Sequence, residues 1–94
     1  MSANLTENEG SHDKARKVSL VRMRPGQSGK IVQISGGYSM FHKLEAMGIV
    51  EGKVITKVSG HWMRGPVLVR ANNTQAALGF GMARRIIVQL VNED

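Results

Sequence analysis

Short apolar segments separated by glycine follow one another from Val18 onward, and this spacing is typical of a small β-rich domain. Alternation within 53–58 places two valines and Thr56 on one face of the expected strand, and Ile55 with two lysines on the other. A glycine-containing turn follows, which predicts an antiparallel hairpin with the next apolar segment. The expected strands are 30–35, 53–58, 66–71, 85–91 and a short segment at 76–78.

One amphipathic helix is expected after the first long strand, over residues 38–47. Apolar side chains recur there at every third position, close to the spacing of one helical face, and we expect this stripe to face the core. Gly48 follows, where a left-handed C-terminal residue is usually glycine. A short second helical turn is expected at 80–84. The stripe consists of Tyr38, Phe41, Leu44 and Met47.

The polar, aperiodic start of the chain predicts a disordered leader at 1–13, followed by one folded domain at 14–94. A chain of 94 residues is too short for two domains, and its ordered part is too short for a two-sheet sandwich of ~100 residues. About five antiparallel strands and one helix instead predict a mostly β, small and partly open barrel. The free edges of such a barrel make self-association into a homo-oligomer an expected property.

The charge of the chain is strongly uneven. The formal net charge is +6, but five of the seven acidic residues lie in the first thirteen or last two positions. The stretch 14–92 holds all thirteen basic residues and only Glu45 and Glu51, which gives it a charge of +11. Such a field favours anionic partners, namely nucleic acid, a phospholipid surface or an acidic protein patch.

Several function classes have little support in the sequence. The chain has no cysteine, which excludes disulfides and thiolate sites. It shows no P-loop, G-x-S-x-G or dinucleotide fingerprint and, apart from its ends, very few acidic or histidine side chains, so we predict that it is not an enzyme. It also lacks an apolar run of about eighteen residues and a secretion signal, so we expect a cytoplasmic protein.

A metal site has only weak candidates. His42 and Glu45 lie at i and i+3 of the expected helix, close enough to share an ion. Two ligands make a weak site, and a charge of +11 repels cations at long range. We therefore predict that the chain has neither a metal site nor a cofactor.

Four segments occur in an order that resembles the bacterial ferrous iron transport protein A (FeoA) family, from about Val18 to Val91. They read Leu20-x-x-Met23-x-Pro25-Gly26-x-x-Gly29-x-Ile31, Leu44-x-x-Met47-Gly48-Ile49-x-x-Gly52, Gly65-Pro66-Val67-x-Val69 and Ala83-x-x-Ile86-x-Val88.

The resemblance implies an SH3-like barrel, a fold that also forms the C-terminal domain of iron-dependent repressors of the diphtheria-toxin-repressor type. It implies a non-enzymatic cytoplasmic accessory of ferrous iron uptake and iron homeostasis, at the inner face of the membrane. The implied partner is the membrane GTPase transporter, ferrous iron transport protein B. Activation of nucleotide hydrolysis, assembly and gating of the pore all remain open as its role.

Two segments are candidate partner-binding surfaces. The end of the helix, with Leu44, Met47 and Gly48, corresponds to a family segment, and its alternative role is core packing. The loop tip at Trp62, Met63 and Arg64 combines residue types that are enriched at interfaces, and its alternative role is to cover the barrel mouth.

The competing function is nucleic-acid binding by a small basic barrel, or a regulatory module akin to the C-terminal domain of iron-dependent repressors. The charge suits phosphate contacts. Single-strand readers also present aromatic platforms, and with Tyr38 and Phe41 expected in the core, only Trp62 is expected to be free to stack. The sequence therefore disfavours a direct nucleic-acid role.

Overall fold

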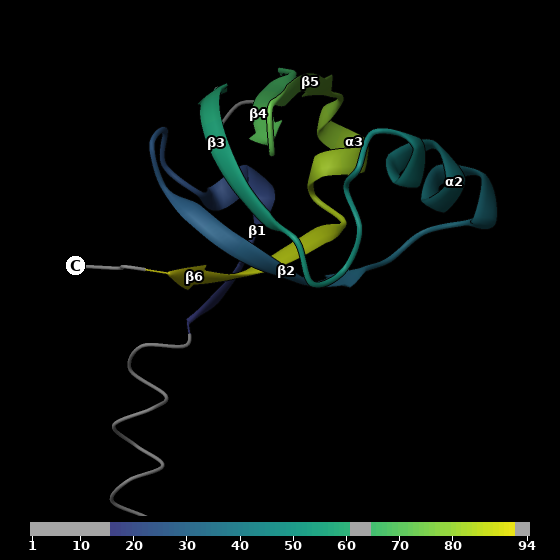
Figure 1. The fold of residues 1–94 in the computed structure, drawn as a ribbon, viewed down its shortest axis with the longest axis horizontal. Helices are drawn as coiled ribbons and strands as arrows, with labels where there is room; N and C mark the ends of the chain where they lie inside the picture. The colour runs from purple at the N-terminus through teal and green to yellow at the C-terminus, as the bar shows by residue number, and fades with distance from the viewer. Residues whose placement is uncertain (1–15, 61–64, 92–94) are drawn as a thin grey trace, which may run out of the picture.

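The computed structural model describes residues 16–60 and 65–91, and these residues form a mostly β structure (Figure 1). Within them lie six strands, one α-helix of nine residues, and two shorter helical segments. The elements are β1 (Lys17–Ser19), the 3-10 helix η1 (Leu20–Arg22), β2 (Ser28–Ile34), α2 (Tyr38–Ala46), β3 (Val54–Gly60), β4 (Val67–Ala71), β5 (Thr74–Leu78), α3 (Phe80–Ala83) and β6 (Ile86–Val91).

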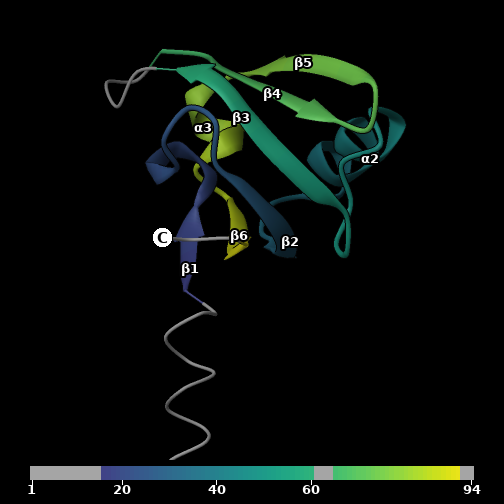
Figure 2. The ribbon, with the colours of Figure 1, turned by 60° about the vertical axis from the view of Figure 1, so that its left-hand side comes forward.

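The strands form one antiparallel sheet in the order β1-β6-β2-β3-β4-β5. The sheet curls, with β4 and β5 on one side of α3 and with β1 and β6 on the other (Figure 2). Register shifts occur between Ile31 and Gln33 in β2 and between Lys57 and Ser59 in β3. Because a bulge bends its strand and increases the local twist, these shifts favour the curl. β1 and β5 remain as the two edges of the sheet.

All five expected strands are present, and the predicted hairpin is the antiparallel pair of β3 and β4. The strand that sequence patterning missed is β1, which pairs with β6 through Val18 opposite Val88. The short helical turn expected at 80–84 is present as α3. The predicted leader at 1–13 lies outside the described residues, so that division of the chain stays a prediction.

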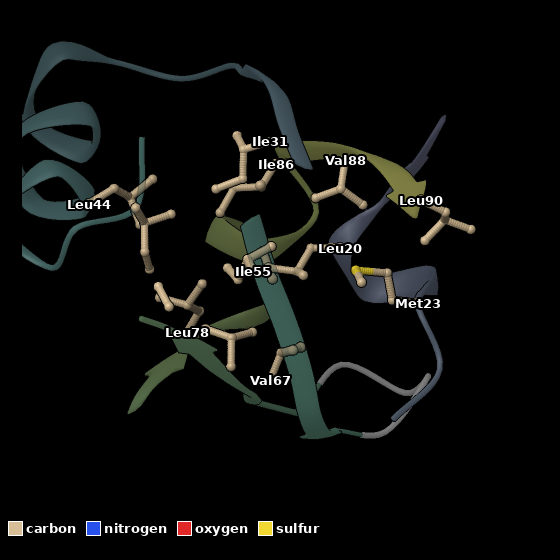
Figure 3. Packing of buried hydrophobic residues seen from close by; sticks show 14 residues of the cluster. Leu20, Met23, Ile31, Leu44, Ile55, Val67, Leu78, Ile86, Val88 and Leu90 are labelled. Atoms are coloured by element: carbon tan, nitrogen blue, oxygen red, sulfur yellow. The ribbon is translucent and has the colours of Figure 1, made fainter. Parts of the chain in front are cut away.

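The core is enclosed by the curled sheet and receives side chains from almost every element (Figure 3). Alternate residues of β4 and of β6 point into it, as expected for strands with one buried face. The fourteen buried hydrophobic residues are Leu20, Met23, Ile31, Leu44, Ile49, Ile55, Val67, Val69, Ala71, Leu78, Ala83, Ile86, Val88 and Leu90.

α2 lies outside the sheet at one end of the molecule, in the connection from β2 to β3 (Figure 1). Leu44 is its only fully buried residue and reaches from the helix toward the core cluster (Figure 3). The helix ends as predicted at Gly48, whose φ is +80°. The Gly48 N–H donates to the Glu45 carbonyl at 2.9 Å, and the Ile49 N–H donates to the Leu44 carbonyl at 2.9 Å. These two bonds form a Schellman motif that brings buried Ile49 beside Leu44.

The face of α2 that meets the core differs from the predicted stripe. Met40, Leu44 and Met47 pack on the core, at positions i, i+4 and i+7. Tyr38 is 78% exposed and Phe41 is 40% exposed, so the expectation that both lie in the core was wrong. A helix turns about 100° per residue, so positions three residues apart do not stay on one face. Tyr38 and Leu44 are six residues apart and point about 120° away from one another.

Candidate partner-binding site

The two weak metal candidates face solvent together on α2. His42 Nδ1 lies 3.5 Å from Glu45 Oε1, and both side chains are about half exposed. The His42 ring also meets the Tyr38 ring edge-on, with centroids 4.3 Å apart. Within residues 16–60 and 65–91, no group of three or more His, Cys, Asp or Glu could hold a metal ion. Two donors do not complete the coordination that transition metals need, so these residues do not fit a metal centre.

The predicted partner surface at the end of α2 is only partly accessible. Leu44 is fully buried and belongs to the core, so its side chain is not presented to a partner in this structure. Met47 and Gly48 are half-buried beside it and remain predicted contacts. The other predicted surface, formed by Trp62, Met63 and Arg64, lies outside the described residues.

Two aromatic side chains that were assigned to the core are instead on the surface. Tyr38 and Phe41 both pack edge-on against His42 along the outer part of α2. The expectation that Trp62 alone is free to stack on a base was therefore wrong. The sequence also holds a second apolar stripe, because Met40 and Leu44 are four residues apart and lie on one helical face. This stripe would have predicted the face that packs on the core.

Lys57 is a buried cation that sequence analysis did not single out. It shares the inward face of β3 with Ile55 and is only 2% exposed. Its Nζ donates hydrogen bonds to the Met23 carbonyl at 2.6 Å and to the Val21 carbonyl at 3.2 Å. Burial lowers the pKa of the Lys57 ammonium, because the charged form loses hydration. The alternation that placed Lys57 with Ile55 was the signal that could have found it.

The backbone of Lys57 holds the same neighbouring segment. The Gly26 N–H donates to the Lys57 carbonyl at 2.7 Å, and the Lys57 N–H donates to the Gln27 carbonyl at 3.0 Å. A tight turn precedes these bonds, in which the Gln27 N–H donates to the Arg24 carbonyl at 3.0 Å. Lys57 therefore fixes residues 21–27 against β3 through both its backbone and its side chain.

A surface cavity of about 550 Å³ opens beside this cluster of hydrogen bonds. One wall is the segment 21–25, and the other described residues that line it are Lys57, Gly60 and Phe80. Gly60 lies so close to the lysine that an added Cβ would meet Lys57 Cε at 3.3 Å. Arg22 and Arg24 are exposed at the wall, and neither Glu45 nor Glu51 lines the cavity. The cavity thus combines three cationic side chains with apolar ones.

The described residues contain no helix that is long and apolar enough to cross a membrane.

Known proteins share this architecture and sequence pattern. The FeoA domain family model matches residues 18–90. A crystal structure of an iron uptake regulatory protein (FeoA) is 33% identical, covers 81% of this chain and all of its own, and superposes with a TM-score of 0.76. No curated protein matches the chain.

Two more distant structures share the fold. A zinc complex of Stenotrophomonas maltophilia FeoA, described as a procaryotic SH3 domain protein and a candidate ferrous iron transport activating factor, is 24% identical, covers 76% of this chain and 88% of its own, and gives a TM-score of 0.64. A manganese-dependent transcriptional repressor is 20% identical, covers 82% of this chain and 43% of its own, and gives a TM-score of 0.75. The SH3-like fold expected from the sequence is confirmed.

Proposed function

The chain belongs to the FeoA domain family of ferrous iron transport, and from this premise we propose that it is a non-enzymatic accessory that binds and modulates a membrane GTPase iron transporter. The observation that supports this most strongly is the family match itself, because it spans residues 18–90 and therefore every described strand apart from Lys17 at the start of β1 and Val91 at the end of β6. The accessory acts at the cytoplasmic side of the membrane.

The residue inventory supports a binding role over a catalytic one. The described residues hold two carboxylates, Glu45 and Glu51, and one histidine, His42. His42 and Glu45 approach one another on the exposed side of α2, and neither lines the cavity beside Lys57. Both side chains are about half exposed, whereas catalytic acid–base pairs normally sit in a cleft that excludes water. The protein therefore acts by contact, and ferrous iron is the cargo of its partner.

The partner surface has two predicted parts. Met47 and Gly48 form one, at the end of α2, which lies outside the sheet at one end of the molecule (Figure 1). The second is the loop tip with Trp62, Met63 and Arg64. The charge of +11 on residues 14–92 favours an acidic protein surface as the docking partner, because opposite potentials steer encounter.

Co-purification from native membranes tests the proposal. The tagged full-length protein is expressed at native level, membranes are solubilised in mild detergent, and recovered proteins are identified by mass spectrometry. We expect the membrane GTPase iron transporter to be enriched over an untagged control. Recovery of ribosomes or RNA without that GTPase would contradict the proposed function.

A direct assay of modulation completes the test. GTP hydrolysis by the purified transporter is measured with and without the protein, at several ratios of the two. A saturable change in rate supports activation or inhibition, and an unchanged rate with retained co-purification assigns the protein to assembly or gating.

Light scattering of the purified protein on a sizing column measures the expected self-association through the β1 and β5 edges.

Exposure of Tyr38 and Phe41 favours nucleic-acid binding as a second candidate function. Aromatic rings on a cationic protein are the features on which single-stranded bases stack. Fluorescence anisotropy with labelled oligonucleotides separates the two functions, because phosphate binding must weaken steeply as salt rises. Tyr38→Ala would weaken such binding if stacking on α2 contributes to it.

A further inference from the structure

The cavity between η1, β3 and α3 is built around a charge that no acidic residue of the described chain neutralises. Lys57 is 2% exposed, and within residues 16–60 and 65–91 its ammonium bonds to two backbone carbonyl oxygens, those of Val21 and Met23. The carboxylates of the described residues, Glu45 and Glu51, do not line the cavity. A buried ammonium without a counter-charge is costly, so a bound anion at this position would be stabilised.

Two further cations lie at the opening. Arg22 and Arg24 are exposed on the wall formed by residues 21–25, and neither pairs with a carboxylate of the described part of the chain. The backbone of Arg24 is held by the Gln27 side chain, whose Oε1 accepts its N–H at 2.8 Å. Guanidinium groups bind carboxylates in a bidentate manner, and here the backbone of Arg24 is held in a hydrogen-bonded turn while Arg22 ends η1.

Among the residues that the structure describes, the rest of the lining is apolar. Val21, Met23, Pro25 and Phe80 contribute these side chains. A free phosphate or a nucleic-acid backbone would leave these surfaces uncovered. A peptide with a carboxylate next to an aliphatic side chain would pair with the cations and cover the apolar wall at the same time.

We propose that this cavity is the docking site for an acidic-aliphatic peptide segment of a partner protein, with Arg22 and Arg24 binding its carboxylate at the opening and Lys57 supplying the buried positive charge. The proposal rests on the proposed function, since it names the chemistry of the transporter segment that the protein recognises. Met47 and Gly48, the predicted contacts at the end of α2, are not among the residues that line this cavity.

Fluorescence anisotropy with purified full-length protein tests the site. The probe is a fluorescein-labelled hexapeptide of alternating glutamate and leucine, and its matched control replaces each glutamate by glutamine. We expect the acidic peptide to bind about tenfold more tightly than the control, and the double variant Arg22→Gln/Arg24→Gln to lose about tenfold in affinity. Arg70→Gln is the control variant, because exposed Arg70 on β4 does not line the cavity.

Three outcomes would overturn the proposal. These are equal affinity for the two peptides, equal loss with Arg70→Gln and with the double variant, and tighter binding of inorganic phosphate or of phosphatidylglycerol vesicles than of the acidic peptide. Both arginines are exposed, so the double variant is expected to stay folded, and its circular dichroism spectrum verifies this.

Co-purification separates this proposal from the proposed function. If the double variant recovers the transporter as well as the wild type does, the cavity is not the docking site while the accessory function stands. If the wild type itself recovers no transporter, the accessory function fails whatever the peptide results.

Discussion

The Lys57 ammonium donates a hydrogen bond of 2.6 Å to the backbone carbonyl of Met23, across 34 residues of sequence. This bond joins the inward face of β3 to the end of η1, where the last carbonyls of a helix lack partners within the helix. Lys57 thus serves as a cap supplied by another element. It also positions the wall of the cationic cavity, which links the stability of the barrel to the proposed binding site.

Removing the ammonium should destabilise the protein. In Lys57→Met the aliphatic stem is preserved, but the Val21 and Met23 carbonyls lose their donor, at a cost of about 1–3 kcal/mol. Lys57→Ala should cost more, because it also leaves a void. Urea unfolding followed by circular dichroism measures both. Lys53→Met, at an exposed position, is the matched control and should change stability by no more than about 0.5 kcal/mol. A Lys57→Met variant as stable as wild type would contradict the capping role.

The contribution of Lys57 to stability should depend on pH. Burial lowers its pKa in the folded state, so between that lowered pKa and the unfolded value of about 10.4 the unfolded chain holds a proton that the folded chain has released. Stability from this group therefore rises as pH increases through that window. Urea titrations from neutral pH upward should show the wild type gaining stability relative to Lys57→Met. The difference in unfolding free energy between wild type and Lys53→Met should not grow in the same way. If the stability of wild type relative to Lys57→Met falls as pH rises, the prediction is contradicted.

The local parts of the fold could be predicted from sequence. Strand alternation, the β3–β4 hairpin and the end of α2 at Gly48 depend on residues close to one another, so their patterns are complete within short windows. β1 was missed because a three-residue strand exists only through its pairing with β6. Its sequence, Lys17-Val18-Ser19, has no pattern long enough to predict a strand.

The candidate site could not be predicted to the same extent. The cavity requires η1 to lie beside β3, and no spacing along the chain encodes that contact. The face of α2 was misassigned for a different reason. A three-residue spacing approximates a helical stripe over one turn only, and Met40 decided which side packs on the core.

The Schellman motif at the end of α2 predicts a specific glycine requirement. Gly48→Ala places a side chain at φ +80°, which should cost about 1–2 kcal/mol. Gly81→Ala in α3 is the control, because an added Cβ there meets nothing within 4 Å, and alanine is the better helix former by about 0.5–1 kcal/mol. Thermal unfolding should therefore rank Gly81→Ala at or above wild type and Gly48→Ala below it. Equal melting temperatures for the two variants would contradict this.

The exposed face of α2 should contribute little to folding. Leu44→Ala removes a fully buried anchor and should cost about 2–5 kcal/mol, whereas Tyr38→Ala should change stability by about 0.5 kcal/mol or less. Chemical denaturation of the two variants measures this contrast on one helix. A large loss for Tyr38→Ala would mean that its contact with His42 stabilises the domain.

Ferrous iron should not bind tightly to the free protein. His42 and Glu45 supply two donors, 3.5 Å apart and about half exposed, and no third donor joins them among the described residues. Transition metals gain most of their affinity from three or four protein ligands, and a net positive chain repels the cation. Anaerobic calorimetry with ferrous iron should give no binding tighter than millimolar, and His42→Ala should leave the trace unchanged. A stoichiometric micromolar isotherm that His42→Ala abolishes would establish an iron site on α2.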